Sequence, residues 1–336
     1  MIFSSGHIST IGIDFGATNV KMVCLKNGKT GLELESHGFI KRKNVDQLKE
    51  MFQSPMIKKS RIRVNIEDAS MKIRKADVPP APKEELEEII KWSMRDVLGN
   101  QTEDFIFRWT PLSKEPKQKE ESYLVYALKR ESIQNYLKLL KELGLKNIDV
   151  LEPNISALYL ALKQNYPLLP KDRYVIIDMG STFTHFSVSS SKGPLFSRPL
   201  GGMAGESLTK QISRNLGIDE EKAEELKIHF PNPDSDTEIQ IKLKNTISHY
   251  YSKAALEIQL SIDAYLTQFP LQNVTKIFFT GGGAHLAGLM EHIEETLNIL
   301  VEKFEPFQKV GTSNFRKEEL NEKKYFYALA YGLALQ

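Results

Sequence analysis

The sequence predicts an α/β protein built from a duplicated domain, and a repeated turn is the first observation behind this prediction. An apolar run enters the turn at residues 14–18, which read D-x-G-x-T, and a second apolar run leaves it. Residues 178–182 repeat this pattern between two further apolar runs, 164 residues later. Apolar runs joined by such tight turns are typical of β-hairpins. The spacing is about one domain length, so each half of the chain starts with a comparable hairpin.

The chemistry of the repeated turn indicates phosphate binding. Asp14 would place a carboxylate at the mouth of the first turn, where it can face Mg²⁺ through water. Gly16 lets the backbone approach a ligand closely, while Ala17 and Thr18 supply backbone N–H groups that can cradle a phosphate. One turn of this kind could serve hairpin geometry alone. Two of them, each headed by an aspartate, indicate two domains that close on a phosphate chain from both sides.

A late glycine-rich turn is the third observation. The apolar strand at residues 276–279 is followed by Thr280-Gly281-Gly282-Gly283. Glycines let the backbone come close to a bound group, because no Cβ atom stands in the way. This turn completes a set of three candidate ligand-binding turns in a fixed order along the chain.

Composition and the absence of certain motifs argue against several classes of function. The chain has 336 residues and a formal net charge of +2, which suits two domains and gives no reason to expect a nucleic-acid partner. Cys24 is the only cysteine, so no disulfide or thiolate metal site can form within the chain. We see no leader peptide and no apolar run of membrane-spanning length, and therefore expect a cytoplasmic protein without direct membrane insertion. Neither a Walker A sequence nor a His-x-x-x-His pair occurs, which disfavours P-loop enzymes and metal hydrolases.

A separate unit is predicted between the two repeated turns. Three prolines at 79, 80 and 82 break a strand pattern, and residues 79–150 then read as about two helices against a small sheet. The first domain is thus expected at residues 1–78 and 151–173. The second is expected at 174–336, with its final helix packing back on the first. Trp92 falls off the apolar stripe of the unit's first helix, so its ring either caps a neighbouring strand or contacts a partner.

The three turns, in this order, resemble the actin, Hsp70 and sugar-kinase superfamily of ATP-binding proteins. The inserted unit narrows the resemblance to FtsA-type and PilM-type proteins. Over essentially its whole length the chain is similar to the PilM family of type IV pilus assembly proteins, most clearly at residues 84–92, 136–145 and 326–335. The resemblance implies a duplicated actin-like (ribonuclease H-like) ATPase fold with an inserted FtsA/PilM-type β/α subdomain.

The resemblance also implies which residues form a nucleotide site. Asp14 and Asp178 correspond to aspartates on the magnesium side. Glu152 corresponds to a position that orients attacking water, while a carboxylate there can equally well fix a helix start. Ala204 and His285 stand where the family more often has glycine and arginine. The implied nucleotide-binding residues are Asp14, Gly16, Ala17, Thr18, Lys21, Asp178, Gly180, Ser181, Thr182, Gly205, Glu224, Lys227, Gly281, Gly282, Gly283 and His285.

The function implied by the resemblance is that of a cytoplasmic ATP-binding scaffold in the type IV pilus assembly platform, with weak or no ATPase activity. Its cofactors would be ATP or ADP with Mg²⁺. Its partner would be a PilN-like inner-membrane protein, bound through a short cytoplasmic peptide, with pilus motor or platform proteins as further candidates. The partner would recruit the protein to the inner face of the inner membrane. The inserted unit and the adjoining first domain are the expected peptide site, with Trp92 as a candidate contact.

Three alternatives remain open from the sequence. An FtsA-like cell-division or filament protein needs a C-terminal amphipathic membrane helix, which the sequence does not show. A small-molecule kinase needs a general base and a polar substrate pocket, and no obvious acid pair occurs between Lys21 and Pro79. A platform domain similar to type II secretion L proteins would continue into a transmembrane segment, which is also missing.

Overall fold

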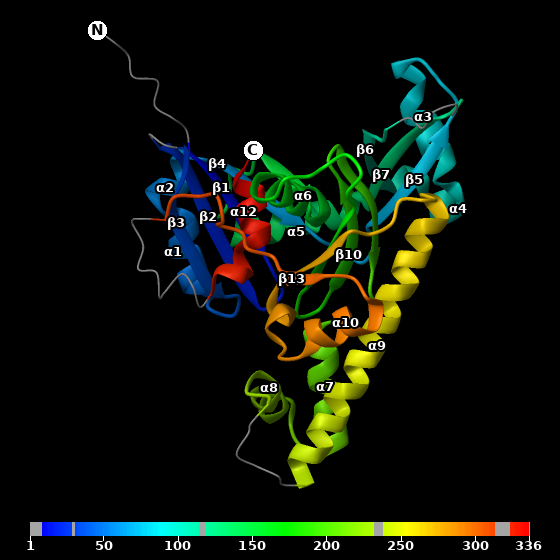
Figure 1. Cartoon of the computed structure of the whole chain (residues 1–336). Coiled ribbons are helices and arrows are strands. Elements are labelled where there is room, and N and C mark those ends of the chain that lie inside the picture. Colours follow the sequence, from blue (N-terminus) through cyan, green and yellow to red (C-terminus); the bar gives the residue numbers. More distant parts are fainter. Residues whose placement is uncertain (1–8, 29–30, 114–118, 232–237, 313–322, 336) are drawn as a thin grey trace.

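The protein consists of two domains with the same sheet topology and a smaller unit inserted into the first domain (Figure 1). The structure is a computed structural model that describes residues 9–28, 31–113, 119–231, 238–312 and 323–335. The two large sheets have the same strand order. If the strands of each sheet are counted along the chain, the order is 3-2-1-4-5 in both. The duplication predicted from the two turns is therefore confirmed.

The first domain is built on a mixed sheet in the order β3-β2-β1-β4-β8. The first three strands pair in an antiparallel manner, whereas β4 and β8 run parallel to β1. Side chains alternate between the faces, so Ile11 and Ile13 pack under one set of helices while Gly12 and Asp14 lie on the opposite face. The elements are β1 (Thr10–Phe15), β2 (Asn19–Gly28), β3 (Gly31–Lys41), α1 (Val45–Gln53), α2 (Pro55–Lys59), β4 (Arg61–Ile66), α5 (Arg130–Glu142), β8 (Val150–Pro153) and α6 (Asn154–Asn165).

The second domain repeats the arrangement in the order β11-β10-β9-β12-β13. Its first three strands are antiparallel, and β12 and β13 run parallel to β9. The elements are β9 (Tyr174–Met179), β10 (Thr184–Ser190), β11 (Gly193–Pro199), α7 (Gly205–Leu216), α8 (Glu220–Ile228), α9 (Glu238–Gln268), β12 (Lys276–Thr280), a 3₁₀ helix (Gly282–His285), α10 (Leu289–Leu297), β13 (Val301–Lys303), a second 3₁₀ helix (Lys324–Tyr327) and α12 (Ala328–Ala334).

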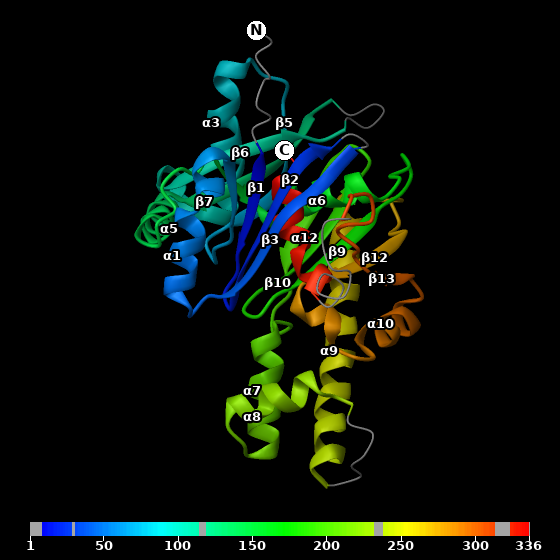
Figure 2. The ribbon, with the colours of Figure 1, turned by 90° about the vertical axis from the view of Figure 1, so that its left-hand side faces the viewer.

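Helices α6 and α12 lie between the two sheets and join their cores (Figure 2). One hydrophobic cluster contains residues of β2, β9 and β12 together with both helices. Helix α12 approaches both β1 and α6 closely, because small residues occupy the points of contact. A Cβ atom at Gly12 would overlap the Ala330 carbonyl oxygen, and one at Gly332 would overlap that of Ala157. These glycines let helix backbone contact both β1 and α6 directly.

The inserted unit is smaller than the predicted 79–150. Strand β5 (Lys72–Val78) pairs with β7 (Glu121–Lys129), which pairs with β6 (Phe105–Pro111), so the unit begins before the three prolines. Its helices are α3 (Lys83–Ser93), α4 (Arg95–Leu98) and a 3₁₀ helix (Gly99–Asp104). The second helix expected here, α5, instead packs Leu140 and Leu143 into the core of the first domain. An apolar stripe specifies that a helix is buried, not which sheet buries it.

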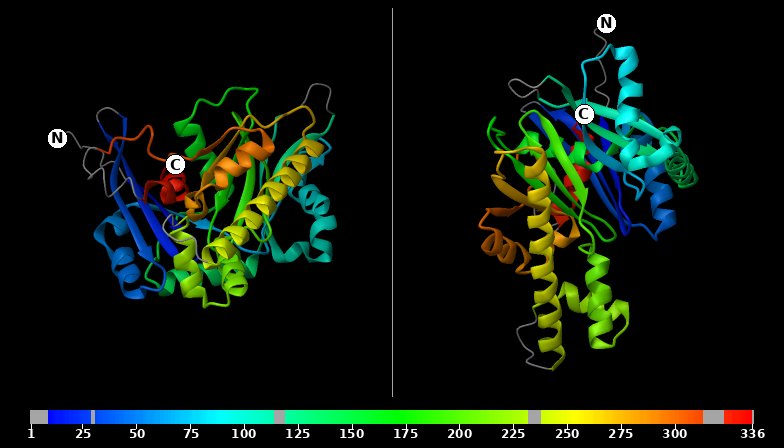
Figure 3. Two further views of the ribbon diagram at one scale, coloured as in Figure 1. Left: turned by 60° about the horizontal axis from the view of Figure 1, so that its bottom comes forward. Right: turned by 90° about the vertical axis from the view of Figure 1, so that its right-hand side faces the viewer.

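Helices α7, α8 and the first half of α9 project away from the sheet of the second domain (Figures 1 and 3). Gly217 ends α7 at φ +68°, a conformation that favours glycine, and the Asp219 carboxylate accepts from the Lys222 N–H to begin α8. The second half of α9 reaches the inserted unit, where Lys75 lies over the Phe269 ring. Among the residues described, no helix combines the length and apolarity needed to span a membrane.

We expect Gly332→Ala to lower the free energy of unfolding by about 3 kcal/mol, because its methyl group would overlap the backbone of Ala157. Urea unfolding measures the change. Gly201→Ala is a matched control, since a Cβ atom there would meet nothing within 4 Å. The control should be unchanged or slightly more stable. Equal stability of the two variants would show that α12 and α6 can separate at no cost.

Candidate nucleotide-binding site

Two aspartates occupy equivalent places at the carboxyl ends of β1 and β9. Asp14 is only 6% exposed, and its Oδ2 accepts from the Lys21 Nζ at 2.8 Å. Asp178 lies within electrostatic reach of Asp14, Glu67, His185 and Lys21. Sheet geometry brings the two carboxylates together, because each ends the central strand of its domain. The structure thus brings the two predicted magnesium-side aspartates to one place between the domains.

The electrostatics of this place favour a cation. Burial, followed by the charges of Glu67 and Asp14, raises the pKa of Asp178 to about 7. Burial also raises the pKa of Asp14, by more than the adjacent Lys21 lowers it. Each carboxylate is harder to ionise because it is dry and because its neighbours are also acidic. In the described part of the chain no group of three His, Cys, Asp or Glu side chains could hold a metal directly. A metal here would therefore keep water or phosphate oxygens among its ligands.

A chain of side-chain amides connects the two aspartate turns. Asn65, at the end of β4, accepts from the Phe15 N–H at 2.7 Å, and its amide group donates to Asn154 Oδ1 at 3.2 Å. Asn154, the first residue of α6, donates in turn to Asp178 Oδ2 at 3.5 Å. The backbone beside Asp14 is thereby tied to the carboxylate of Asp178. Sequence reasoning did not single out Asn65 or Asn154 as functional residues.

Glu67 and His185 form a second connection between the domains. Glu67 follows β4 in the first domain, His185 lies on β10 in the second, and the two side chains approach to 2.5 Å. Burial lowers the pKa of His185, but the adjacent carboxylate of Glu67 outweighs burial and raises it. These residues were also missed. One signal could have pointed to Glu67 alone: it follows β4, which runs parallel to β1, and ligands of open α/β sheets bind at the carboxyl ends of such strands. His185 lies near the start of the antiparallel strand β10 and carries no such signal.

The second turn is bonded to the start of α7. The Gly205 N–H donates to the Gly180 carbonyl at 3.0 Å, and the Glu206 N–H donates to the Ser181 carbonyl at 2.9 Å. The positive end of α7 therefore faces the turn. The tips of both turns are solvent-accessible, with Ala17, Thr18 and Thr182 exposed. A phosphate chain could reach both tips without displacing core residues.

A buried lysine joins α7 and α8 beside this turn. Lys227 Nζ donates to Glu224 Oε2 at 2.6 Å, to Thr209 Oγ1 at 2.9 Å and to the Gly205 carbonyl at 3.2 Å. The Thr209 hydroxyl donates to the same Glu224 oxygen at 2.5 Å. The predicted residues Gly205, Glu224 and Lys227 are thus brought together.

The glycine-rich turn passes directly over β9. A Cβ atom at Gly281, whose φ is +79°, would crowd the Met179 carbonyl, and one at Gly283 would overlap the Met179 side chain. His285 stacks on Phe326, with ring centroids 4.7 Å apart and planes inclined by 11°. Burial, followed by the charge of Lys303, lowers the pKa of His285, which favours the neutral imidazole. The turn therefore presents its backbone groups and the flat, neutral imidazole ring of His285 to a ligand.

Glu152 lies in a different setting from the two aspartates. Its Oε2 accepts from Arg63 Nη2 at 2.7 Å, and burial raises the pKa of Glu152 by more than Arg63 lowers it. Glu67, and not Glu152, is among the charges that act on Asp14 and Asp178. The role in water positioning stays a prediction, and the carboxylate that it would need is engaged by Arg63.

Comparison with solved structures places this arrangement in a known class. The chain aligns with a diol dehydratase-reactivating factor in nucleotide-free form at a TM-score of 0.54 and 10% identity, covering 98% and 99% of the two chains. It aligns with MreB5 of Spiroplasma citri bound to ADP at a TM-score of 0.52 and 13% identity, covering 97% and 94%. The fold and the paired turns define an actin-like protein, as the sequence predicted.

The particular family follows from the sequence. The sequence model of the family described as Type IV pilus assembly protein PilM matches residues 12–336, and the chain belongs to this family. The solved PilM-PilN type IV pilus biogenesis complex aligns at a TM-score of 0.79 and 20% identity, over 98% of each chain. None of the curated proteins searched matches. Family membership confirms the resemblance and selects the pilus branch over the kinase and cell-division branches.

We expect Asp178→Asn to change how stability depends on pH. The pKa of folded Asp178 is about 7, against an ordinary value of 3.8. Because ionisation is disfavoured only in the folded state, the wild type should lose stability as the pH rises from about 4 to about 7. Asparagine does not titrate, so the variant should not show this loss. The free energy of unfolding of the variant, relative to that of the wild type, should therefore increase as the pH rises over this range. Urea unfolding at several pH values, without divalent cation or nucleotide, measures the difference. Parallel profiles would contradict the prediction.

Proposed function

We propose that this PilM family member is an actin-like scaffold of a type IV pilus assembly platform that binds Mg-ATP or Mg-ADP between its two domains. The observation that carries the proposal is the pair of aspartates at the ends of equivalent strands, of which Asp14 is buried and Asp178 half-buried. A hydrated Mg²⁺ between them would relieve their repulsion and bridge to phosphate oxygens. Some solved actin-like structures contain nucleotide, including MreB5 bound to ADP, which supports the same choice.

One set of residues would hold the phosphates of the nucleotide, and a second set would hold the adenosine. The phosphates would lie between the exposed turn tips and the start of α7, with Lys21 as a cation beside the first turn. The adenosine would lie against the glycine-rich turn, near His285 and the Glu224–Lys227 pair. Hydrolysis would be slow, because Glu67 pairs with His185 and Glu152 pairs with Arg63, so neither carboxylate is available as a general base.

We expect Asp14→Ala and Asp178→Ala each to weaken Mg²⁺-dependent binding of ADP by about tenfold or more, since each removes a carboxylate near the ion. Titration calorimetry with and without Mg²⁺ measures the effect. Asp46→Ala is the matched control, because Asp46 is an exposed aspartate in the first turn of α1. Absence of any affinity in the wild type at millimolar nucleotide would refute the assignment.

The proposed partner is the short cytoplasmic peptide of a PilN-like inner-membrane protein, which would recruit the chain to the membrane. The structural similarity to the PilM chain of a solved PilM-PilN complex supports the choice of partner. The site would lie where the inserted unit meets the first domain. One face of the inserted sheet, through Leu124 and Tyr126, packs on Ile155 of α6. The first-domain strand β4 lies close to this contact, and its Arg63 pairs with Glu152 of β8.

Two exposed side chains of the inserted unit, Arg108 and Trp92, lie on different faces of the inserted sheet and can test which face the peptide uses. Arg108 on β6 is exposed and sits opposite Tyr126, so it shares the face that packs on the first domain. Trp92 lies on α3, which covers the other face, and its side chain is 68% exposed. The ring therefore does not cap a strand of the unit, and the partner interpretation of Trp92 requires a peptide that reaches the outer surface of α3.

A pair of variants tests the location. If the peptide lies on the first-domain side, Arg108→Glu should weaken binding by about tenfold or more while Trp92→Ala leaves it unchanged. The opposite result would place the peptide on α3. Fluorescence anisotropy with a labelled N-terminal peptide of the PilN-like protein measures affinity, and thermal melts check that both variants are folded. Deleting residues 72–129 should abolish peptide binding but retain ADP binding. A folded deletion variant that still binds the peptide would exclude the inserted unit.

A further inference from the structure

Two adjoining cavities form a groove between the inserted unit and the second domain. The first, of about 480 Å³, is bordered by β5, by β11 and by the second half of α9. The second, of about 420 Å³, continues past the turn between β10 and β11 to the loop before β9. Lys75, Leu195 and Gln268 line both. β5 and β11 are edge strands of their sheets, so the groove follows two sheet edges.

Cations dominate the lining of this groove. The described lining residues include only two carboxylates, Glu67 and Asp68, both at the end nearest the nucleotide site. Glu67 pairs with His185, and Asp68 accepts from the N–H and hydroxyl of Ser70. The cationic lining residues are Lys72, Arg74, Lys75, Arg173, Lys192 and Arg198. Away from the nucleotide site, the groove is therefore positive.

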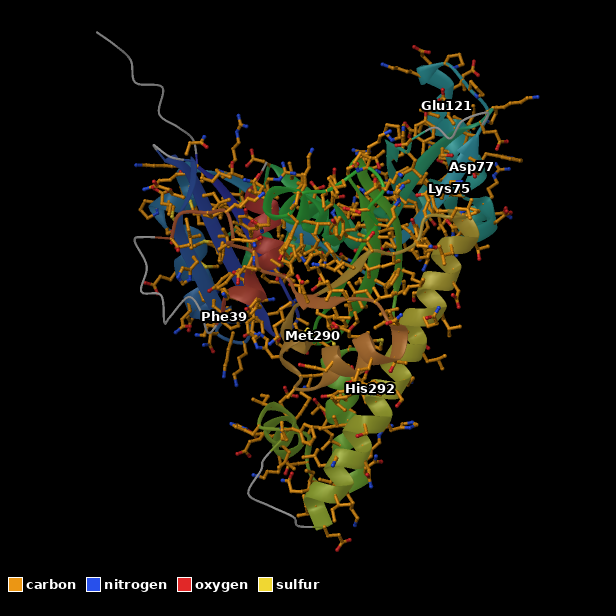
Figure 4. All side chains as sticks on the ribbon, in the orientation of Figure 1. Phe39, Lys75, Asp77, Glu121, Met290 and His292 are labelled. Atoms are coloured by element: carbon orange, nitrogen blue, oxygen red, sulfur yellow. The ribbon has the colours of Figure 1, made fainter. Side chains whose placement is uncertain are left out.

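Five of these six cations have no carboxylate of their own among the described residues. Lys75 pairs with Asp77 at 2.8 Å, and both side chains lie on the inserted sheet near the end of α9 (Figure 4). By contrast, no ion pair with any residue that the structure describes is formed by Lys72, Arg74, Arg173, Lys192 or Arg198. Cations gathered in a concave site without counter-charges attract an anionic ligand.

Apolar side chains interrupt the positive lining. Phe183, which is among the exposed large apolar residues, lies at the nucleotide end, and the half-buried Ile73 lies on β5. Leu195 contributes where the two cavities meet. A nucleic-acid or lipid phosphate surface would require a continuous open cationic track, whereas this groove is recessed and mixed. An extended peptide that alternates acidic and apolar residues matches both its shape and its chemistry.

We propose that this groove binds an extended acidic segment of a partner protein. The groove runs along β5, whereas the PilN-like peptide is tested on the β6 side, which is the opposite edge of the inserted sheet. Leu124 and Ile155 lie between the two and also line the groove. Its lining also includes Glu67, Asn154 and His185, which connect the two domains at the nucleotide site. The occupant therefore contacts all three parts of the molecule, and its binding is coupled to the spacing of the two domains.

The test uses the full chain and a labelled peptide of about eight alternating glutamate and leucine residues, with a glutamine–leucine peptide as the neutral probe. We expect the wild type to bind the acidic peptide at least about tenfold more tightly, with affinity falling as salt is raised. Lys192→Glu/Arg198→Glu should remove that preference, with the melting temperature unchanged. Arg214→Glu/Lys244→Glu is the matched control, since it reverses one exposed arginine and one exposed lysine far from the groove.

Each result bears on the proposal. Equal binding of the two peptides by the wild type, or an equal loss in both double variants, would overturn it. Sedimentation of the wild type with phosphatidylserine vesicles, abolished by Lys192→Glu/Arg198→Glu, would assign the groove to a membrane surface instead. Affinities for Mg-ADP and for the PilN-like peptide should be the same in wild type and in that variant. If the wild type binds no Mg-ADP or no PilN-like peptide, the proposed function is wrong, but the assignment of this groove still stands.

Discussion

The mutual repulsion of Asp14 and Asp178, which act on each other across the two domains, is the constraint on which the rest of the site depends. Asp14 and Asp178 are each held by the central strand of its own sheet, so the distance between them is set by how the two domains pack together. Repulsion between like charges grows as water is excluded, and both carboxyl groups have raised pKa values. Lys21 offsets part of this charge and pairs directly with Asp14. The fold therefore concentrates negative charge between the two domains, and the proposed hydrated cation would offset that charge.

The same constraint explains why the domains are connected where they are. The amide chain through Asn65 and Asn154 and the contact between Glu67 and His185 all lie around the two aspartates. A ligand that changes the charge between the aspartates changes the environment of these connections as well. Since the basic groove shares Glu67, Asn154 and His185, the two ligands would act on the same contacts, and any coupling between them would be reciprocal.

The sequence predicted the features that follow from local chemistry. The repeated aspartate turns and the glycine-rich turn were recognisable because turn residues, strands and phosphate cradles require particular residues at close spacing. Glu67 and His185 were not, since their meeting depends on how two sheets are placed. The extent of the inserted unit was also misjudged. The prolines at 79–82 follow β5, whose partner lies more than forty residues later, and no local signal records that pairing. For α5, the stripe that contains Leu140 and Leu143 would fit either sheet.

The position of α12 has a consequence for how the chain is made. Its backbone fills the space above Gly12 and beside Ala157, and its Tyr331 and Leu333 belong to a cluster with Val23 and Leu25 of β2. More than three hundred residues separate α12 from its partners on β1 and β2. Contacts of such long sequence separation form late, because the loop must close before they contribute. During synthesis the first domain would thus emerge with an open apolar face, and it would be completed only after the second domain had been translated.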